Sequence, residues 1–324
     1  MLPAGAAEGL NRQFTVPMRV FTDLLRILFE PPDVDATVHS RREEEGLVIE
    51  DLSWPSIDGE TVPAFLIRPA NAAGRLPAII CLHGTSTNRE VNTTRKFEYA
   101  EWTRYGTEQK TTTLFGWARE LSRRGYVTLS ITQRGLDNRQ PDTEARNKAL
   151  LVHGRNVMGT IVYEIRQGLT YLRQRPEVDP EKIGSTGISF GGITTFYTWL
   201  TDDRIAAAAP ICGGIGSVEE FIKHGARGYH GSYWWVPDLL SKGDHGDFVA
   251  AMAPRPLMLW APRNDIGMPN AGIDRFLERA VPAFKQVGAA DRLVIHRPPG
   301  EHAMTMEAFE AMFQFFERFL KRAG

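Results

Sequence analysis

Residues 183–200 read IGSTGISFGGITTFYTWL, and the pattern Gly-x-Ser-x-Gly within them lies where two kinds of structure meet. The apolar run 183–187 predicts a buried strand, and 191–200 predicts a helix. A serine hydroxyl is a weak nucleophile, so it needs a sharp turn on which a base can reach it and backbone N–H groups can face the substrate. Glycines on both sides of Ser189 allow such a turn. A strand before the pattern and a helix after it are the context in which Gly-x-Ser-x-Gly marks a nucleophile.

Short apolar runs alternate with helical stretches on both sides of this junction, which is typical of a parallel sheet with crossover helices. Six runs predict its strands: 78–82, 127–132, 183–187, 205–211, 257–261 and 293–297. The predicted helices are 114–124, 149–174, 191–200, 273–287 and 303–321. Two further strands, 47–54 and 61–68, predict an antiparallel hairpin at the start. We therefore expect an α/β fold with a mostly parallel, eight-stranded sheet covered by helices on both faces.

The expected domain organisation follows from length and from the pattern at the N-terminus. A chain of 324 residues with this sheet is expected to form a single domain over 1–324. Apolar residues recur at helical spacing from Val20 to Phe29, and Pro31-Pro32 ends that pattern. Residues 1–45 are therefore expected to be an N-terminal helical extension.

A catalytic base must come from one of eight histidines. His302 lies between the last predicted strand and the final predicted helix, where a loop can bring its imidazole over Ser189. The chain order serine, aspartate, histidine is also the one that accompanies a nucleophile of this kind. His296 lies within an apolar strand and is expected to be packed in the core. Three other histidines are candidates for contact with a substrate: His224, His230 and His245.

The acid is expected at the end of a strand between the serine and the histidine. Asp265 follows the apolar run 257–261, whereas Asp274 falls inside a predicted helix. Its task is to accept the second imidazole N–H, which fixes the tautomer and stabilises the imidazolium. The alternative is that Asp265 is a turn residue that bonds its own backbone.

A developing oxyanion needs preorganised N–H donors. The amide after the nucleophile belongs to Phe190, and the loop after the third strand supplies that of Thr85. His83 precedes this loop, so we expect it to shape the loop and to take part in substrate binding rather than in proton transfer. Arg134 ends the fourth strand, where a role in tying loops together is preferred to contact with substrate.

Two segments are too long to be simple connections, because loops in such units usually have about two to six residues. They are residues 86–113 and 213–250. Long excursions at the carboxyl ends of strands form ligand sites in α/β sheets, so both are expected to line the pocket. The second contains four clustered aromatic residues: Tyr229, Tyr233, Trp234 and Trp235. We expect Trp234 and Trp235 to contact the substrate; the alternative is that these rings pack on the body of the protein.

Composition excludes several classes of function. Basic and acidic residues number 38 and 39 and no basic stripe is present, which argues against nucleic acid as a partner. No apolar run is long enough for a membrane span, and the stretch 20–29 is interrupted by Asp23 and Arg26 and lacks the flanks of a secretion signal. Cys81 and Cys212 are too few for a disulfide framework or a zinc site. We therefore expect reduced thiols, a cytoplasmic location and no metal.

From about residue 45 the chain resembles α/β-hydrolases of the dienelactone-hydrolase-like and acetyl-xylan-esterase-like group. The resemblance rests on Leu82-His83-Gly84, Arg134-Gly135, Arg175-Pro176-Glu177-Val178-Asp179, Lys182-Ile183-Gly184, Gly187-Ile188-Ser189-Phe190-Gly191-Gly192, Ala253-Pro254-Arg255-Pro256-Leu257, Asp265 and His302. It implies an esterase fold without cofactor, this same triad, and residues 233–237 at the border of the site. The chain departs from acetyl-xylan esterases at Leu136 and Ala303, and from dienelactone hydrolases proper in having serine rather than cysteine as nucleophile.

These inferences predict a serine hydrolase that cleaves a small or medium carboxylic ester through an acyl-enzyme, without cofactor. The aromatic residues of the second insertion favour an apolar or ring-bearing substrate. One alternative is an acyl-peptide hydrolase of the prolyl-oligopeptidase kind, which would add a propeller domain. Another is a catalytically silent binding protein, because a fold alone does not establish activity.

Overall fold

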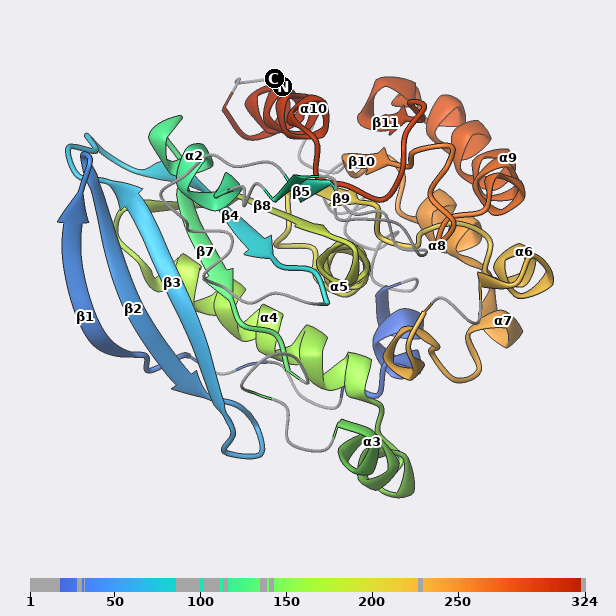
Figure 1. Ribbon diagram of the computed structural model, residues 1–324, viewed down its shortest axis with the longest axis horizontal. Helices are drawn as coiled ribbons and strands as arrows, with labels where there is room; N and C mark the ends of the chain where they lie inside the picture. Colours follow the sequence, from blue (N-terminus) through green and yellow to red (C-terminus); the bar gives the residue numbers. More distant parts are fainter. Residues whose placement is uncertain are drawn as a thin grey trace, which may run out of the picture.

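A computed structural model describes residues 18–27, 31, 33–85, 100–101, 111–112, 116–134, 139, 143–226 and 230–321. A nine-stranded sheet runs through the described chain in the order β1-β2-β3-β7-β4-β8-β9-β10-β11 (Figure 1). Its strands are β1 Thr37–Glu44, β2 Leu47–Pro55, β3 Thr61–Pro69, β4 Leu76–Leu82, β7 Val127–Ile131, β8 Val178–Ile188, β9 Ala207–Ile211, β10 Leu257–Trp260 and β11 Leu293–His296. The pairs from β1 to β7 are antiparallel, and those from β7 to β11 are parallel. The predicted α/β class and mostly parallel sheet are confirmed.

The ninth strand, β1, corrects two predictions: the count of eight strands and the helical nature of residues 1–45. Its sequence, TVHSRREE, has no apolar alternation, and nearly every residue is exposed. It forms an edge of the sheet by pairing with β2. Glu44 at its end forms an ion pair of 3.1 Å with Arg119. Charged edge strands discourage pairing with other chains, which explains why this strand has no apolar pattern.

Helices cover both faces of the sheet: α2 and α10 lie on one side, and α4 and α5 on the other (Figure 1). Their bounds are α2 Trp117–Arg123, α3 Thr143–Val152, α4 Val157–Gln174, α5 Phe190–Thr201, α6 Val218–Lys223, α7 Leu239–Lys242, α8 His245–Ala251, α9 Asn270–Gln286 and α10 Met306–Phe316. The predicted helix 149–174 is in fact two helices, because Gly154 has a φ of 69° and Asn156 caps α4 by accepting from the Gly159 N–H at 2.7 Å. Within the described residues no helix combines the length and apolarity needed to cross a bilayer.

The described part of the N-terminal segment packs on the body of its own chain. Residues 18–24 are helical. The ring of Phe21 is fully buried and lies 5.0 Å from that of Tyr197 in α5. The following turn lies so close to α4 that a Cβ on Gly159 would be 1.8 Å from the Leu25 carbonyl oxygen. The first helix is therefore part of the main hydrophobic core.

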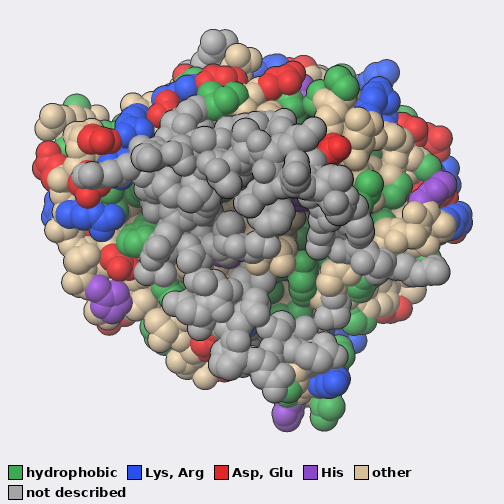
Figure 2. Space-filling view, viewed as in Figure 1, with side chains coloured by type: hydrophobic (Ala, Val, Ile, Leu, Met, Phe, Trp, Pro, Cys, Tyr) green, Lys and Arg blue, Asp and Glu red, His purple; other side chains and the backbone are tan. Residues whose placement is uncertain are grey.

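Among the described residues on the face that Figure 2 shows, basic and acidic side chains are interspersed around the edge of the view. The second long segment, 213–250, contains α6, α7, α8 and the 3-10 turn η4 Ser232–Trp234. Of the first, 86–113, the structure describes only β5 Ala100–Glu101 and β6 Thr111–Thr112, which pair with each other. The prediction that this first segment lines the pocket therefore falls mostly on residues outside the described ones.

Candidate active site

Ser189 occupies a sharp turn between β8 and α5. Its φ of 57° and ψ of −116° are unusual for a residue with a side chain, at a cost of about 1–3 kcal/mol. The Ser189 N–H donates to the Ile211 carbonyl at 2.9 Å, which holds the turn against the end of β9. A Cβ on Gly191 would lie 2.1 Å from the Leu82 carbonyl oxygen, and one on Gly187 would lie 2.5 Å from the same atom. Close packing against β4 therefore requires both glycines.

His302 and Asp265 form a hydrogen-bonded pair: His302 Nδ1 lies 2.8 Å from Asp265 Oδ2. The aspartate is only 2% exposed, and its second oxygen, Oδ1, accepts from the Gly267 N–H at 2.9 Å. Asp265 therefore contacts both the imidazole and its own turn, which are the contacts that the two interpretations require. The loops that carry the pair are joined by two backbone hydrogen bonds, Arg263 N–H to Pro298 O at 2.9 Å and Asn264 N–H to Gly300 O at 3.0 Å.

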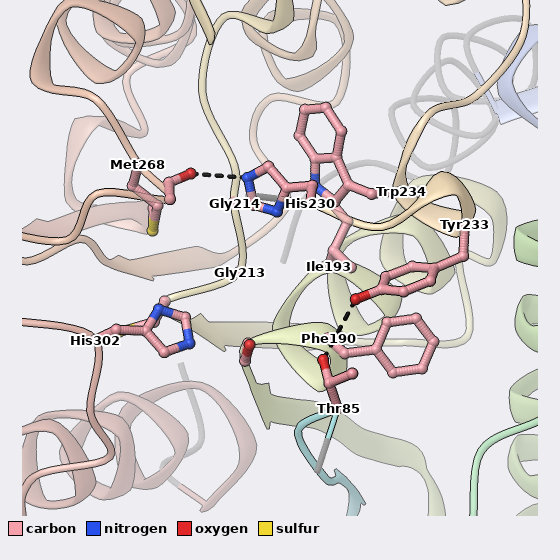
Figure 3. Close-up of a pocket in the computed structure, with 13 residues that line it drawn as sticks. Thr85, Phe190, Ile193, Gly213, Gly214, His230, Tyr233, Trp234, Met268 and His302 are labelled. Atoms are coloured by element: carbon pink, nitrogen blue, oxygen red, sulfur yellow. Dashed lines mark hydrogen bonds between the residues drawn. The ribbon is translucent and has the colours of Figure 1, made fainter. Parts of the chain in front are cut away.

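A narrow pocket lies at the carboxyl ends of the parallel strands, and Ser189 and His302 both line it. Figure 3 shows how the labelled side chains converge on it. Thirteen residues form its walls: Thr85, Ser189, Phe190, Ile193, Cys212, Gly213, Gly214, His230, Tyr233, Trp234, Gly267, Met268 and His302. The residues predicted as base, nucleophile and oxyanion donors therefore lie around one cavity, and the predicted acid lies behind the base.

The loop after β4 is held by a buried histidine. The Gln133 N–H donates to His83 Nε2 at 3.0 Å, so the proton is on Nδ1, which donates to the Gly84 carbonyl at 2.8 Å. In a planar trans peptide the next N–H points opposite to that carbonyl. His83 thus turns the Thr85 N–H away from its own ring. His83 is fully buried and is not among the residues that line the pocket, so it shapes the loop as expected, but the structure does not place it for substrate contact.

Gln133 joins this loop to α5. Its side-chain amide N–H donates to the His83 carbonyl at 2.8 Å, and its Oε1 accepts from the Thr194 hydroxyl at 2.6 Å. All three residues are buried. Gln133 was not predicted from the sequence, although its place directly after a buried strand, at the edge where the pocket lies, is a signal that could have identified it.

The two predicted tryptophans have different positions. Trp234 lines the pocket, where its ring stacks on His230 at a centroid distance of 4.4 Å. Trp235 does not line it: together with Trp234 it lines a second cavity of about 230 Å³ beside α7, and its indole N–H donates to the His230 carbonyl at 3.4 Å. Adjacent residues leave a short turn in different directions, so a shared role does not follow from adjacency.

The three histidines considered for substrate contact also lie in different places. His230 lines the pocket, and its Nε2 lies 2.8 Å from the Gly267 carbonyl oxygen. His245 is fully buried behind the pocket wall, beside the Tyr197 hydroxyl at 3.1 Å. The side chain of His224 is half exposed on α6.

Cys212 is a neighbour of the site that the sequence did not reveal. It is buried, as predicted for a core thiol, and directly follows β9. Its Sγ, a carboxylate oxygen of Asp265 and a ring nitrogen of His302 all lie within 4.8 Å of one another. Burial, together with the nearby Asp265 carboxylate, raises the pKa of the Cys212 thiol well above its usual range. Cys212 is therefore a neutral packing partner beside the acid and the base, at the pocket wall.

Arg134 has the structural role that was preferred for it. The guanidinium is 6% exposed and forms ion pairs with Asp58, Glu60 and Glu164 at 2.8, 2.8 and 2.6 Å. Asp58 and Glu60 lie in the turn between β2 and β3, and Glu164 in α4. The cluster ties the antiparallel hairpin to the parallel part of the sheet.

Comparison with known proteins agrees with this architecture. Residues 104–226 match the model of the dienelactone hydrolase family. The chain is therefore similar to this family over that segment. It is 26% identical to "Putative hydrolase YtaP" of Bacillus subtilis (strain 168) over 301 residues, which are 92% of this chain and 97% of that protein. The resemblance found in the sequence and the enzyme class, a carboxylesterase-type hydrolase, are confirmed.

Solved structures show the same fold at low sequence identity. The glucuronoyl esterase from Solibacter usitatus superposes with a TM-score of 0.69 at 15% identity, over 95% of this chain and 93% of that one. The acetyl xylan esterase from Paenibacillus sp. R4 superposes with a TM-score of 0.63 at 17% identity, over 94% and 95%. The segment that matches the dienelactone hydrolase family model therefore lies within an α/β-hydrolase fold.

Proposed function

We propose that this hydrolase cleaves small or medium carboxylic esters through a Ser189-His302-Asp265 triad. The observation that carries the proposal is the 2.8 Å contact between His302 and the buried Asp265, at a pocket that Ser189 also lines from a strained turn. A carboxylate on Nδ1 keeps the proton there and leaves Nε2 as the lone-pair nitrogen. The imidazole can then accept a proton from the serine.

The reaction proceeds in two halves. Ser189 Oγ attacks the ester carbonyl carbon while His302 Nε2 takes the hydroxyl proton, and the Phe190 and Thr85 amides stabilise the oxyanion. The C–O bond to the alcohol then breaks, and the imidazolium returns its proton to the leaving oxygen. Water attacks the acyl-enzyme in the same way, with His302 as base, and releases the acid and the free serine.

Two features support the choice of oxyanion donors. Phe190 is the first residue of α5, where N–H groups have no helical carbonyl to accept them. The Thr85 N–H is turned away from His83 by the bond to the Gly84 carbonyl, and Gly84 packs beside Ser189, since a Cβ on it would lie 3.7 Å from the serine Cβ. Both amides thus belong to segments that meet at Ser189.

The pocket walls suggest the kind of acyl or alcohol group. Ile193, Met268 and Trp234 present apolar surface to the cavity. Such a lining accommodates a short alkyl or aryl group. Among the described residues that line the pocket, none is an aspartate, glutamate, lysine or arginine. The glucuronoyl and acetyl xylan esterases of the same fold act on esters of carbohydrates by name, so sugar esters belong in the substrate panel.

The test is turnover of p-nitrophenyl acetate by Ser189→Ala. We expect at least about a 10⁴-fold loss of kcat, because removal of a triad nucleophile leaves only binding and oxyanion stabilisation. Ser185→Ala is the matched control: this serine lies in β8, is buried, and is not among the pocket residues. A fluorophosphonate should label the wild type and not Ser189→Ala. Unchanged turnover by that variant, or labelling at another residue, would refute the proposal.

A further inference from the structure

Tyr233 contacts both residues whose amides are the proposed oxyanion donors. Its hydroxyl lies 3.3 Å from the Thr85 hydroxyl, and its ring meets the Phe190 ring edge to face, with centroids 4.5 Å apart and planes at 77°. Figure 3 shows the Tyr233 ring next to that of Phe190, with the Tyr233 hydroxyl directed at Thr85. Thr85 and Phe190 are more than a hundred positions apart in the sequence, and one side chain from the 213–250 segment joins them.

The backbone that carries Tyr233 is anchored on its other side. The Trp234 N–H donates to the Gly231 carbonyl at 3.0 Å, and the buried Trp234 ring stacks on His230. His230 Nε2 lies 2.8 Å from the Gly267 carbonyl oxygen, which requires an N–H on that nitrogen. The Gly267 N–H in turn donates to Asp265. The segment therefore bridges the loop of the acid and the loop of the oxyanion donors.

We propose that Tyr233 is a positioning residue that holds the oxyanion hole in its reactive geometry. The hydroxyl fixes the Thr85 loop through its side chain, and the ring fixes Phe190 at the start of α5. Donors stabilise a transition state most when they are already in place before charge develops, because no reorganisation then opposes the reaction. This role rests on the proposed function, since it concerns the same oxyanion.

The hydroxyl contact can be removed while the ring contact is retained. Tyr233→Phe deletes the hydroxyl and retains the ring on Phe190, and Thr85→Val deletes the partner hydroxyl and retains the backbone N–H. Each variant should lose about 10-fold in kcat with KM changed less than about two-fold, a fraction of the 10²–10³-fold cost of deleting a donor outright. The double variant should lose no more than either single one, because both substitutions break one hydrogen bond. Tyr233→Ala, which also removes the ring, should lose about 100-fold.

A matched control separates positioning from stability. The hydroxyl of buried Tyr126 donates to Glu317 at 2.9 Å, in a part of the molecule that does not line the pocket. Tyr126→Phe should lower the melting temperature and leave kcat unchanged. An aryl trifluoromethyl ketone, which adds to an active serine as a charged hemiketal, gives a second readout. Its affinity should fall with kcat in Tyr233→Phe and not in Tyr126→Phe.

Three results would overturn the role. Wild-type kcat in Tyr233→Phe would show that the hydroxyl does nothing for the reaction. A loss in Tyr233→Phe with none in Thr85→Val would show that the hydroxyl acts on the substrate directly and not through Thr85. Equal loss of kcat in Tyr126→Phe would assign the effect to stability. Failure of the proposed function is a different result: wild type and Ser189→Ala would then turn over the ester equally, and a role at its oxyanion would be excluded with it.

Discussion

Asp265→Asn isolates the contribution of the acid, because the two oxygens of this side chain accept from two different donors. Oδ1 accepts from the Gly267 N–H at 2.9 Å, and Oδ2 lies 2.8 Å from His302 Nδ1. An asparagine has only one oxygen for these two sites. If its NH₂ faced Gly267, two donors would meet in a buried place at a cost of about 1–3 kcal/mol. The oxygen is therefore expected to stay on Gly267, with the NH₂ facing His302.

The consequence for the base is a change of tautomer. With an NH₂ facing it, Nδ1 must accept, so the single imidazole proton moves to Nε2, the nitrogen that faces the serine in the proposed mechanism. The base is then in the wrong form to take the Ser189 proton, and the imidazolium loses its carboxylate partner. The same exchange in a serine-protease triad lowers kcat about 10⁴-fold, which corresponds to about 5.5 kcal/mol of transition-state stabilisation. We expect a loss of that order here.

The assay is p-nitrophenyl acetate hydrolysis at pH 7 to 8 by purified variants whose melting temperatures match the wild type. Asp274→Asn is the control: Asp274 lies nearby in α9, is exposed, and pairs with Arg297 rather than with a histidine. It removes the same charge and should leave kcat within about two-fold, as expected for a surface ion pair. A kcat for Asp265→Asn within about ten-fold of wild type would contradict the tautomer argument.

Two further predictions concern stability and can be measured by denaturant unfolding. Gly191→Ala should destabilise the fold by about 3 kcal/mol or more, because its Cβ would meet a β4 carbonyl oxygen at 2.1 Å. Gly84→Ala should fold normally, because among the described residues beyond its chain neighbours the nearest heavy atom to its Cβ would be 3.7 Å away. Equal stability of the two variants would contradict the steric reasoning. Burial lowers the pKa of His245 from 6.5 to about 4, so between those pH values the unfolded chain binds a proton that the folded chain does not. The free energy of unfolding should therefore fall as the pH drops from 6.5 toward 4, by about 2 kcal/mol between pH 7 and pH 5. An unchanged pH dependence of stability in His245→Gln would refute this prediction. An NMR titration of the ring checks the pKa directly.

Apolar runs predicted the parallel sheet well, because strands buried on both faces must be apolar throughout. The triad candidates were predicted from their positions relative to these strands. Ser189 and Asp265 come at or just after strand ends, and His302 lies in the loop between the last strand and the last helix. Strand β1 could not be predicted in this way, because its charged residues face solvent and its sequence has no alternation of apolar residues. The boundary between α3 and α4 was missed although Gly154 and Asn156 are ordinary turn and cap residues.

The directions in which side chains point also could not be predicted from the sequence. His83 and Trp235 lie in segments that reach the pocket. Two hydrogen bonds turn the His83 side chain into the core, however, and Trp235 faces another cavity. Tyr233 was only one of four clustered aromatic residues until its contacts with Thr85 and Phe190 distinguished it. Such differences arise from tertiary packing, which a pattern along one chain does not encode.

The Gln133 amide has a consequence for how this enzyme can diversify. It hydrogen-bonds the His83 carbonyl with one end and the Thr194 hydroxyl with the other, so the oxyanion loop and the nucleophile helix share one internal brace. Loss of the Gln133 amide or of the Thr194 hydroxyl removes a buried hydrogen bond, at about 1–3 kcal/mol. New substrate preferences are therefore easier to acquire by exchanging pocket residues of the 213–250 segment, with Tyr233 retained, than by altering the braced interior. Chimeras that receive these pocket residues from a relative should keep the fold while changing which esters they accept.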